Sequence, residues 1–329
     1  CIRDRPPIFK QIRAQLNTLM ASQTMTALSK ALTVLHSVFK KRPRFPYLLY
    51  IMVMAIVDSA AVLFIQWGTY TEPTYTAPST VDETTRLLNS IRGQLTRFVA
   101  QMWMEQKYIW LLNFCVLGMV YLVLIFVLNR FWVATALFAI ITSVFAVANH
   151  IKIQLRNEPV IPSDLSFISS GNGGEIASFI PKDSQALVNN TITMLVWLTI
   201  ACLLLQFIDG RRCVISFHWR RPLRNTKTII GNCTRIVAVI VSTSLLCSFT
   251  LNLNTVGSWS HNWAQALGDS PTLWDAAGDA SLNGPTINFL RLANPKTMTK
   301  PSDYSQATMQ EIAQRYNKIA KKTNQSRSN

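Results

Sequence analysis

The chain has 329 residues, of which 49% are hydrophobic and 15% charged, with a formal net charge of +16 at pH 7. The charged residues cluster between apolar runs of about 20 residues, long enough to cross a bilayer, which excludes an ordinary soluble domain. The basic residues flank these runs and no aromatic-basic module is present, so we expect attraction to anionic lipid and no nucleic-acid partner.

The apolar pattern predicts an all-α membrane protein with five transmembrane helices, juxtamembrane amphipathic helices and an extracellular linker. A membrane barrel is excluded because it would show segments of about ten residues alternating apolar and polar. Asn129-Arg130 divides one long apolar stretch into two spans joined by a tight turn, since a charge at the centre of a single span would cost about 2.5 to 3.5 kcal/mol. The transmembrane domain is expected at 47–253, with spans at about 47–68, 109–128, 131–150, 191–208 and 235–253.

Basic residues predict the orientation. Residues 1–46 contain nine Lys and Arg against one acid, and residues 209–233 contain six against one. Both segments are expected in the cytoplasm. The protein is therefore predicted to be a multi-pass protein of the cell membrane with a cytoplasmic N-terminus and an extracellular C-terminus.

The N-terminal segment 1–46 also has apolar residues three or four apart between 12 and 39, which predicts an interfacial amphipathic helix. The chain begins at Cys1, and we expect a fragment that has lost its start. A lipidated terminal cysteine is the alternative, but it would place the basic segment outside. The other five cysteines lie in spans or in the basic inner loop, so no disulfide framework is indicated.

The first exported loop contains an apolar stripe between Leu87 and Met102, typical of an amphipathic helix on the outer face or of a helix packed over the bundle. Asp58 is the one acid within a span. An intramembrane carboxylate is costly and indicates a function by default, with a packing role near the outer third of the helix, paired with Gln66 or Ser59, as the alternative.

The second exported loop has the most unusual sequence, from Arg156 to Leu165. Pro159 and Pro162 forbid a continuing helix and stiffen the backbone, while three charged residues follow the third span. A lipid head group is the predicted ligand, with the phosphate bound by Arg156 and glycerol hydroxyls by Glu158 or Asp164. The alternative is that Arg156 only extends toward water and Glu158-Pro159 only caps a turn.

Residues 254–329 are expected to form an extracellular linker, because this tail is too small and polar to hold an enzymatic core. It has three tryptophans near its start, a turn at Asn283-Gly284-Pro285 and a polar helix at about 303–322. The four histidines are isolated in sequence, so no metal site is predicted. No nucleophile or phosphate-binding motif is present, so no catalytic residue and no cofactor is assigned to this chain.

Several short motifs resemble the lipoteichoic acid synthase family, the phosphoglycerol transferases of Gram-positive bacteria. They are Arg156 to Leu165, Asn283-Gly284-Pro285 with Asn288-Phe289-Leu290, Met298 to Pro301, and Asp303-Tyr304-Ser305. The five spans, inner N-terminus and exported tail are also similar, so the resemblance covers nearly the whole chain.

The resemblance implies the membrane half of an enzyme of cell-wall biogenesis. In that family the spans precede an exported sulfatase and alkaline-phosphatase type domain, which uses a threonine nucleophile and manganese. That domain transfers glycerophosphate from phosphatidylglycerol to a polymer on a glycolipid anchor. The chain stops at Asn329, about where such a domain would begin, so we expect the catalytic domain to be missing from this sequence.

Two other functions compete with the transferase. A small self-contained lipid transporter or flippase would need polar residues along a path through the membrane and usually an internal repeat, yet only Asp58 is charged there. A membrane scaffold would recruit cell-wall or division proteins through the inner loops, but no motif favours it.

Overall fold

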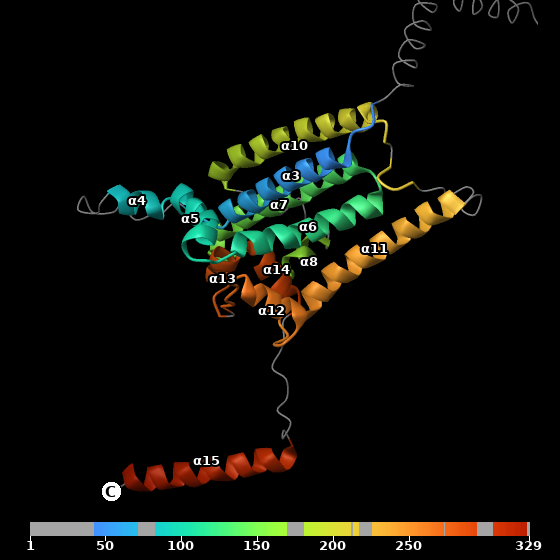
Figure 1. Ribbon diagram of the computed structural model, residues 1–329. Coiled ribbons are helices and arrows are strands. Elements are labelled where there is room, and N and C mark those ends of the chain that lie inside the picture. The colour runs from blue at the N-terminus through green and yellow to red at the C-terminus, as the bar shows by residue number, and fades with distance from the viewer. Residues whose placement is uncertain are drawn as a thin grey trace, which may run out of the picture. The chain divides into compact units, whose positions relative to one another are not determined.

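The computed structural model describes residues 43–71, 83–169, 181–211, 213–216, 226–272, 274–294 and 305–327. Throughout these segments the chain forms helices and no strand (Figure 1). The predicted interfacial helix between 12 and 39 and the motif from Met298 to Pro301 lie outside the described residues. The chain divides after Ala293 into two units, which are described separately.

Five helices in the described residues are long and apolar enough to cross a membrane. This finding confirms the predicted all-α membrane fold and makes the chain a multi-pass membrane protein. The five are α3 (Tyr47–Trp67), α6 (Ile109–Leu128), α7 (Phe131–Arg156), α10 (Lys182–Ile208) and α11 (Thr226–Asn252).

Three of these helices extend beyond the predicted spans. Helix α7 continues past residue 150 to Arg156, α10 begins at Lys182 rather than 191, and α11 begins at Thr226 rather than 235. Hydropathy detects only the part of a helix that lies in hydrocarbon, whereas backbone hydrogen bonds extend the same helix into polar sequence. At these three ends the helices therefore extend six to nine residues beyond the predicted spans.

Helix α7 is the centre of the bundle. In its most apolar stretch 61% of the residues are buried, against 17% in the corresponding stretch of α10 and 11% in that of α11. Tyr121 of α6 stacks on Phe138 of α7 with 4.2 Å between ring centroids, and its hydroxyl donates to Thr135 at 2.6 Å. Ala134 and Ala146 on α7 are fully buried and let neighbouring helices approach closely. Helices α3, α6 and α7 thus form the main core.

The turn between α6 and α7 lies at Asn129, as predicted. Asn129 has a left-handed backbone with φ of 54°, and its N–H donates to Ile125 O at 2.8 Å. Its side chain also donates to Ile215 O at 2.7 Å and accepts from Ile215 N at 2.8 Å. An asparagine tolerates this backbone conformation and at the same time attaches the loop before α11 to the bundle.

Three short helices cover one end of the bundle. They are α12 (Trp259–Ala266), α13 (Ala276–Asn283) and α14 (Pro285–Ala293). Ala264 and Ile287 are fully buried in a second core with Leu112 of α6 and Phe249 of α11. We call this end, where α3, α7 and α11 finish, the capped end. The first 40 residues of the predicted linker therefore pack onto the bundle.

The apolar stripe between Leu87 and Met102 forms two helices, α4 (Glu83–Asn89) and α5 (Ile91–Met104). Ser90 separates them because its side chain accepts from Gly93 N at 3.1 Å as an N-cap. Phe98 of α5 is only 2% exposed and belongs to the main core. Helix α5 thus packs against the bundle, as the second of the two interpretations expected.

The second unit contains α15 (Gln306–Arg327), close to the polar helix expected at 303–322. None of its residues is buried.

In the first unit, the end opposite the cap is organised by Asp209, which is fully buried. Its carboxylate accepts from the Tyr50 hydroxyl and from Trp132 Nε1 at 3.2 Å. These bonds hold the loop after α10 against α3 and α7.

Candidate functional site

The loop after α7 begins at the capped end with a left-handed residue. Asn157 has φ of 53°, and its N–H donates to Ile153 O at 2.8 Å, which ends the helix. Pro159 is buried, and Val160 N donates to Asn149 Oδ1 at 2.9 Å. The hydrogen bond to Asn149 attaches the loop at Pro159, which was predicted to be stiff, to the last turns of α7.

Asp164 closes this loop. Its Oδ2 accepts from Ile161 N at 2.9 Å and from Lys152 Nζ at 2.7 Å, and the short helix α8 (Asp164–Ser169) begins there. Pro162 lies in the turn that leads into α8. A carboxylate engaged in this way positions the loop, so binding of a head group through Asp164 would have to compete with Lys152.

Arg156 and Glu158 differ from Asp164 in their surroundings. Both are exposed at the end of α7, on either side of Asn157. Within the described part of the chain, no ion pair joins Arg156 to Glu158 or to Asp164. Of the three predicted head-group ligands, the structure leaves Arg156 and Glu158 accessible on a loop whose backbone is held in place.

A second group of polar side chains lies beside this loop. His150 is 7% exposed, stacks on Trp67 with 4.4 Å between ring centroids, and approaches Gln154 at 3.0 Å. Ser184 of α10 donates to Gln154 Oε1 at 3.2 Å. The His150 ring also interacts with the backbone of Gly68, whereas Asn149 Nδ2 has no hydrogen-bond partner in the described residues. Sequence analysis missed this group because each residue is unremarkable within its own helix.

Asp58 lies near the middle of α3, not in its final third. It is fully buried, and neither carboxyl oxygen has a hydrogen-bond partner among the described residues. A Cβ atom on Gly118 of α6 would lie 3.1 Å from Oδ2, so Gly118 makes room for the carboxyl group. The expected partner Gln66 instead donates to Tyr70 at 2.8 Å and to Ser281 O at 3.0 Å.

The cap contains a buried ion cluster that was not predicted. Arg291 of α14 is 2% exposed and contacts Asp269 and Asp279, with shortest distances of 2.6 Å to each. Among the described residues, this one cation is paired with both carboxylates. Burial raises the pKa of Asp269 above its usual value, and Arg291 opposes this shift. Such a cluster holds three chain segments in one arrangement.

The Asn283-Gly284-Pro285 motif joins the cap to α6. Asn113 Nδ2 donates to Asn283 O at 2.9 Å. Gly284 has φ of +92°, and a Cβ atom there would collide with the Asn113 side chain. Asn288 is 2% exposed and donates to Ala276 O at 3.2 Å. Beyond the turn predicted at Asn283-Gly284-Pro285, Asn283 and Gly284 therefore dock the cap on α6.

The sequence matches no family model, no curated protein and no solved structure.

Proposed function

We propose that this chain is the membrane anchor and lipid-presenting portion of a glycerophosphate transferase of the lipoteichoic acid synthase type. Its lipid substrate would be phosphatidylglycerol, and its acceptor a polymer on a glycolipid anchor. The capped end would face the outside of the cell membrane, as the distribution of Lys and Arg predicts. The threonine nucleophile and manganese expected for this family belong to a catalytic domain and not to these residues.

The observation that carries the proposal is the fixed loop at Arg156. Asn149 and Lys152 of α7 bind the loop at Val160 and Asp164, while the Arg156 side chain remains exposed. An exposed guanidinium beside a fixed backbone is suited to a lipid phosphate, because its fork of N–H donors matches phosphate oxygens. A fixed position also lowers the entropic cost of bringing lipid to a reactive centre.

The test is the Arg156→Ala substitution in the complete gene, expressed in a Gram-positive strain depleted of its own synthase. A charge-assisted hydrogen bond contributes about 1.5 to 3 kcal/mol, so we expect polymer synthesis to fall by about tenfold or more. Polymer length and amount are measured by gel analysis of cell extracts, with membrane insertion checked by immunoblotting of membrane fractions.

The matched control is Arg130→Ala, which removes an exposed arginine at the opposite end of the same helix. It should leave synthesis unchanged. Equal polymer in the wild type and the Arg156→Ala variant, at equal insertion, would refute a role of Arg156 in lipid binding. Failure of the complete wild-type gene to restore any polymer would refute the transferase proposal itself.

A further inference from the structure

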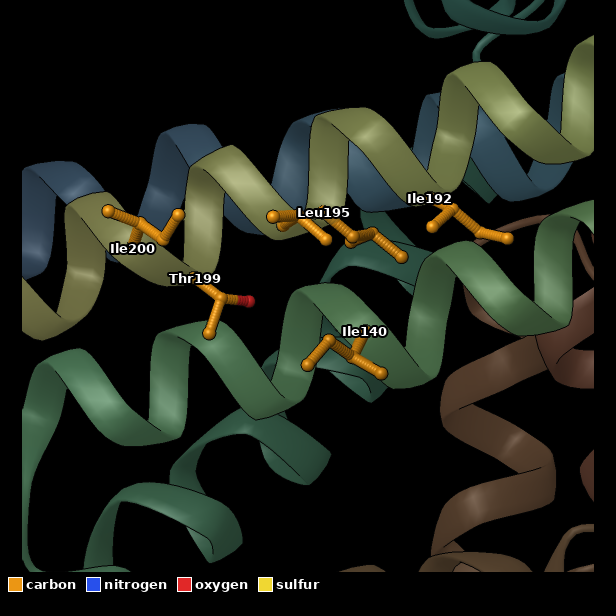
Figure 2. A pocket seen from close by; sticks show the side chains of 6 residues that line it. Ile140, Ile192, Leu195, Thr199 and Ile200 are labelled. Atoms are coloured by element: carbon orange, nitrogen blue, oxygen red, sulfur yellow. The ribbon is translucent and has the colours of Figure 1, made fainter.

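A groove lies between α7 and α10 on the membrane-facing side of the bundle. Its volume is about 340 Å³. Figure 2 shows Leu195 and Thr199 of α10 extending toward α7, where Ile140 lies opposite. The remaining lining residues are aliphatic: Ile192, Val196 and Ile200.

The groove occupies the half of the membrane nearer the capped end. Its lining on α10 begins at Ile192 and finishes at Ile200, a rise of about 12 Å along the helix at 1.5 Å per residue. One leaflet of a hydrocarbon core about 30 Å thick has a depth of about 15 Å. Val196 is 51% exposed, so the groove is open to the surrounding lipid. Its length therefore suits the acyl chain of one leaflet.

Polar side chains continue the same face of α10 toward the capped end. Lys182, Gln185 and Asn189 precede Ile192 at steps of three and four residues, so they lie above the groove on one side of the helix. All three are exposed. Their ammonium and amide N–H groups are donors suited to the oxygens of a phosphate.

The α7 side of the groove has polar groups at the same level. Gln154 is bonded to Ser184 of α10, and His150 beside it is buried. His150 lies 10 residues beyond Ile140, a rise of about 15 Å. An apolar groove thus leads to a polar rim made by both helices.

We propose that this groove holds one acyl chain of a glycerophospholipid from the capped-end leaflet, with its phosphate at Lys182 and Asn189. This inference rests on the proposed function for the presentation of lipid. It extends that function by naming a second place where the chain holds lipid. A transmembrane helix is the less suitable occupant, because helix association in lipid favours small residues that let backbones approach. The groove is lined by branched side chains, all aliphatic except Thr199, which leave room for a thin chain and not for a backbone.

The experiment is photo-crosslinking of the purified full chain in phosphatidylglycerol vesicles that contain a tracer of the same lipid with a diazirine on its acyl chain. Peptide mass spectrometry locates the adducts. We expect labelling at 192–200 and around Ile140 to exceed labelling of the exposed α11 residues Ile236 to Val241 by about fivefold, which corresponds to about 1 kcal/mol of preference. Equal labelling of all membrane-facing helices would overturn the proposal.

Matched variants on α10 test the groove itself. Val196→Trp fills the groove and should lower labelling at Ile140 by about fivefold. Met194→Trp introduces the same indole side chain at a residue that is 50% exposed, close to the 51% of Val196, and that does not line the groove. It should leave labelling unchanged. Equal effects of the two variants would refute a specific chain in the groove.

The polar rim is tested by competition. Unlabelled phosphatidylglycerol should displace the tracer better than diacylglycerol, which lacks phosphate, so tracer labelling should rise when diacylglycerol replaces part of the phosphatidylglycerol of the vesicles. Asn189→Ala with Lys182→Gln should remove this difference. Asn190→Ala, at the next and also exposed residue, is the control. Equal displacement by both lipids in the wild type would overturn the phosphate assignment. If the complete gene makes no polymer but the groove is still labelled specifically, the transferase proposal is refuted and the groove proposal stands.

Discussion

Asp58 and Asp209 are both fully buried carboxylates in the membrane bundle, but their surroundings are opposite. Asp209 accepts hydrogen bonds from Tyr50, Trp132 and the backbone of Arg211, so its acceptor sites are in use. Asp58 has no hydrogen-bond partner among the described residues and faces Gly118. An unpartnered polar group lowers stability, whereas a bonded one contributes to a fixed structure. Asp58 is therefore the stronger candidate for a function inside the membrane.

We predict that Asp58→Asn leaves the thermal unfolding midpoint in detergent within about 3 °C of the wild type, because no bond is lost. Asp209→Asn is the control, and it should destabilise by about 1 to 3 kcal/mol, since a charged acceptor is replaced. Equal losses in both variants would show that Asp58 has an essential partner. If the purified protein transports lipid in vesicles and Asp58→Asn abolishes that transport, a transporter is favoured over the proposed function.

Helices α12, α13 and α14 depend on polar contacts as much as on apolar ones. Arg291 joins Asp269 of the segment before α13 to Asp279 within α13. Asn254 Nδ2 donates to Arg291 O at 2.8 Å, which ties the same residue to the end of α11. Ile287 supplies a buried apolar contact at the centre. The cap is thus one cooperative element whose position on the bundle depends on Arg291.

Arg291→Met tests this dependence. Removing the cation leaves two buried carboxylates without compensation, and breaking a buried pair in this way costs about 3 to 5 kcal/mol. We expect faster proteolysis within 254–293 while the helical circular dichroism of the spans is retained. Arg327→Met, at an exposed residue of α15, is the control and should not change cleavage. Unchanged cleavage in the Arg291→Met variant would contradict the assigned role.

The whole molecule combines a central core of α3, α6 and α7 with two helices at its edge. Helix α10 packs mainly on α7, and α11 packs on α6 and on the cap. Since no apolar driving force joins helices within lipid, these edge helices are held by side-chain packing and by bonds such as that from Arg235 to Val127 O at 2.9 Å. The loops and the cap hold them in place, and both ends of the bundle therefore contribute to its architecture.

The predicted orientation is tested by labelling with a membrane-impermeant maleimide. Cys213, which is exposed in the loop opposite the cap, should react only after permeabilisation. A single cysteine at Trp274, which is 87% exposed beside the cap, should react in intact cells when the other cysteines are replaced. The reverse pattern would invert the topology and remove the basis for a lipid-facing enzyme at the outer surface.

The sequence by itself determined the fold class and the existence of five spans, because long apolar runs have one stable arrangement in a bilayer. It also indicated the turn at Asn129 and the loop between Pro159 and Pro162, since local backbone preferences act there. Helix ends in polar sequence, such as the start of α10 at Lys182, were missed because backbone bonding does not follow hydropathy.

Only the tertiary structure decided which polar residues meet. Asp269, Asp279 and Arg291 lie far enough apart in the chain that no short motif contains all three, yet they form one buried cluster. The pairing of Asp164 with Lys152 also depends on the loop returning to α7. Burial and partner choice result from packing between elements, and a single sequence carries no record of that packing.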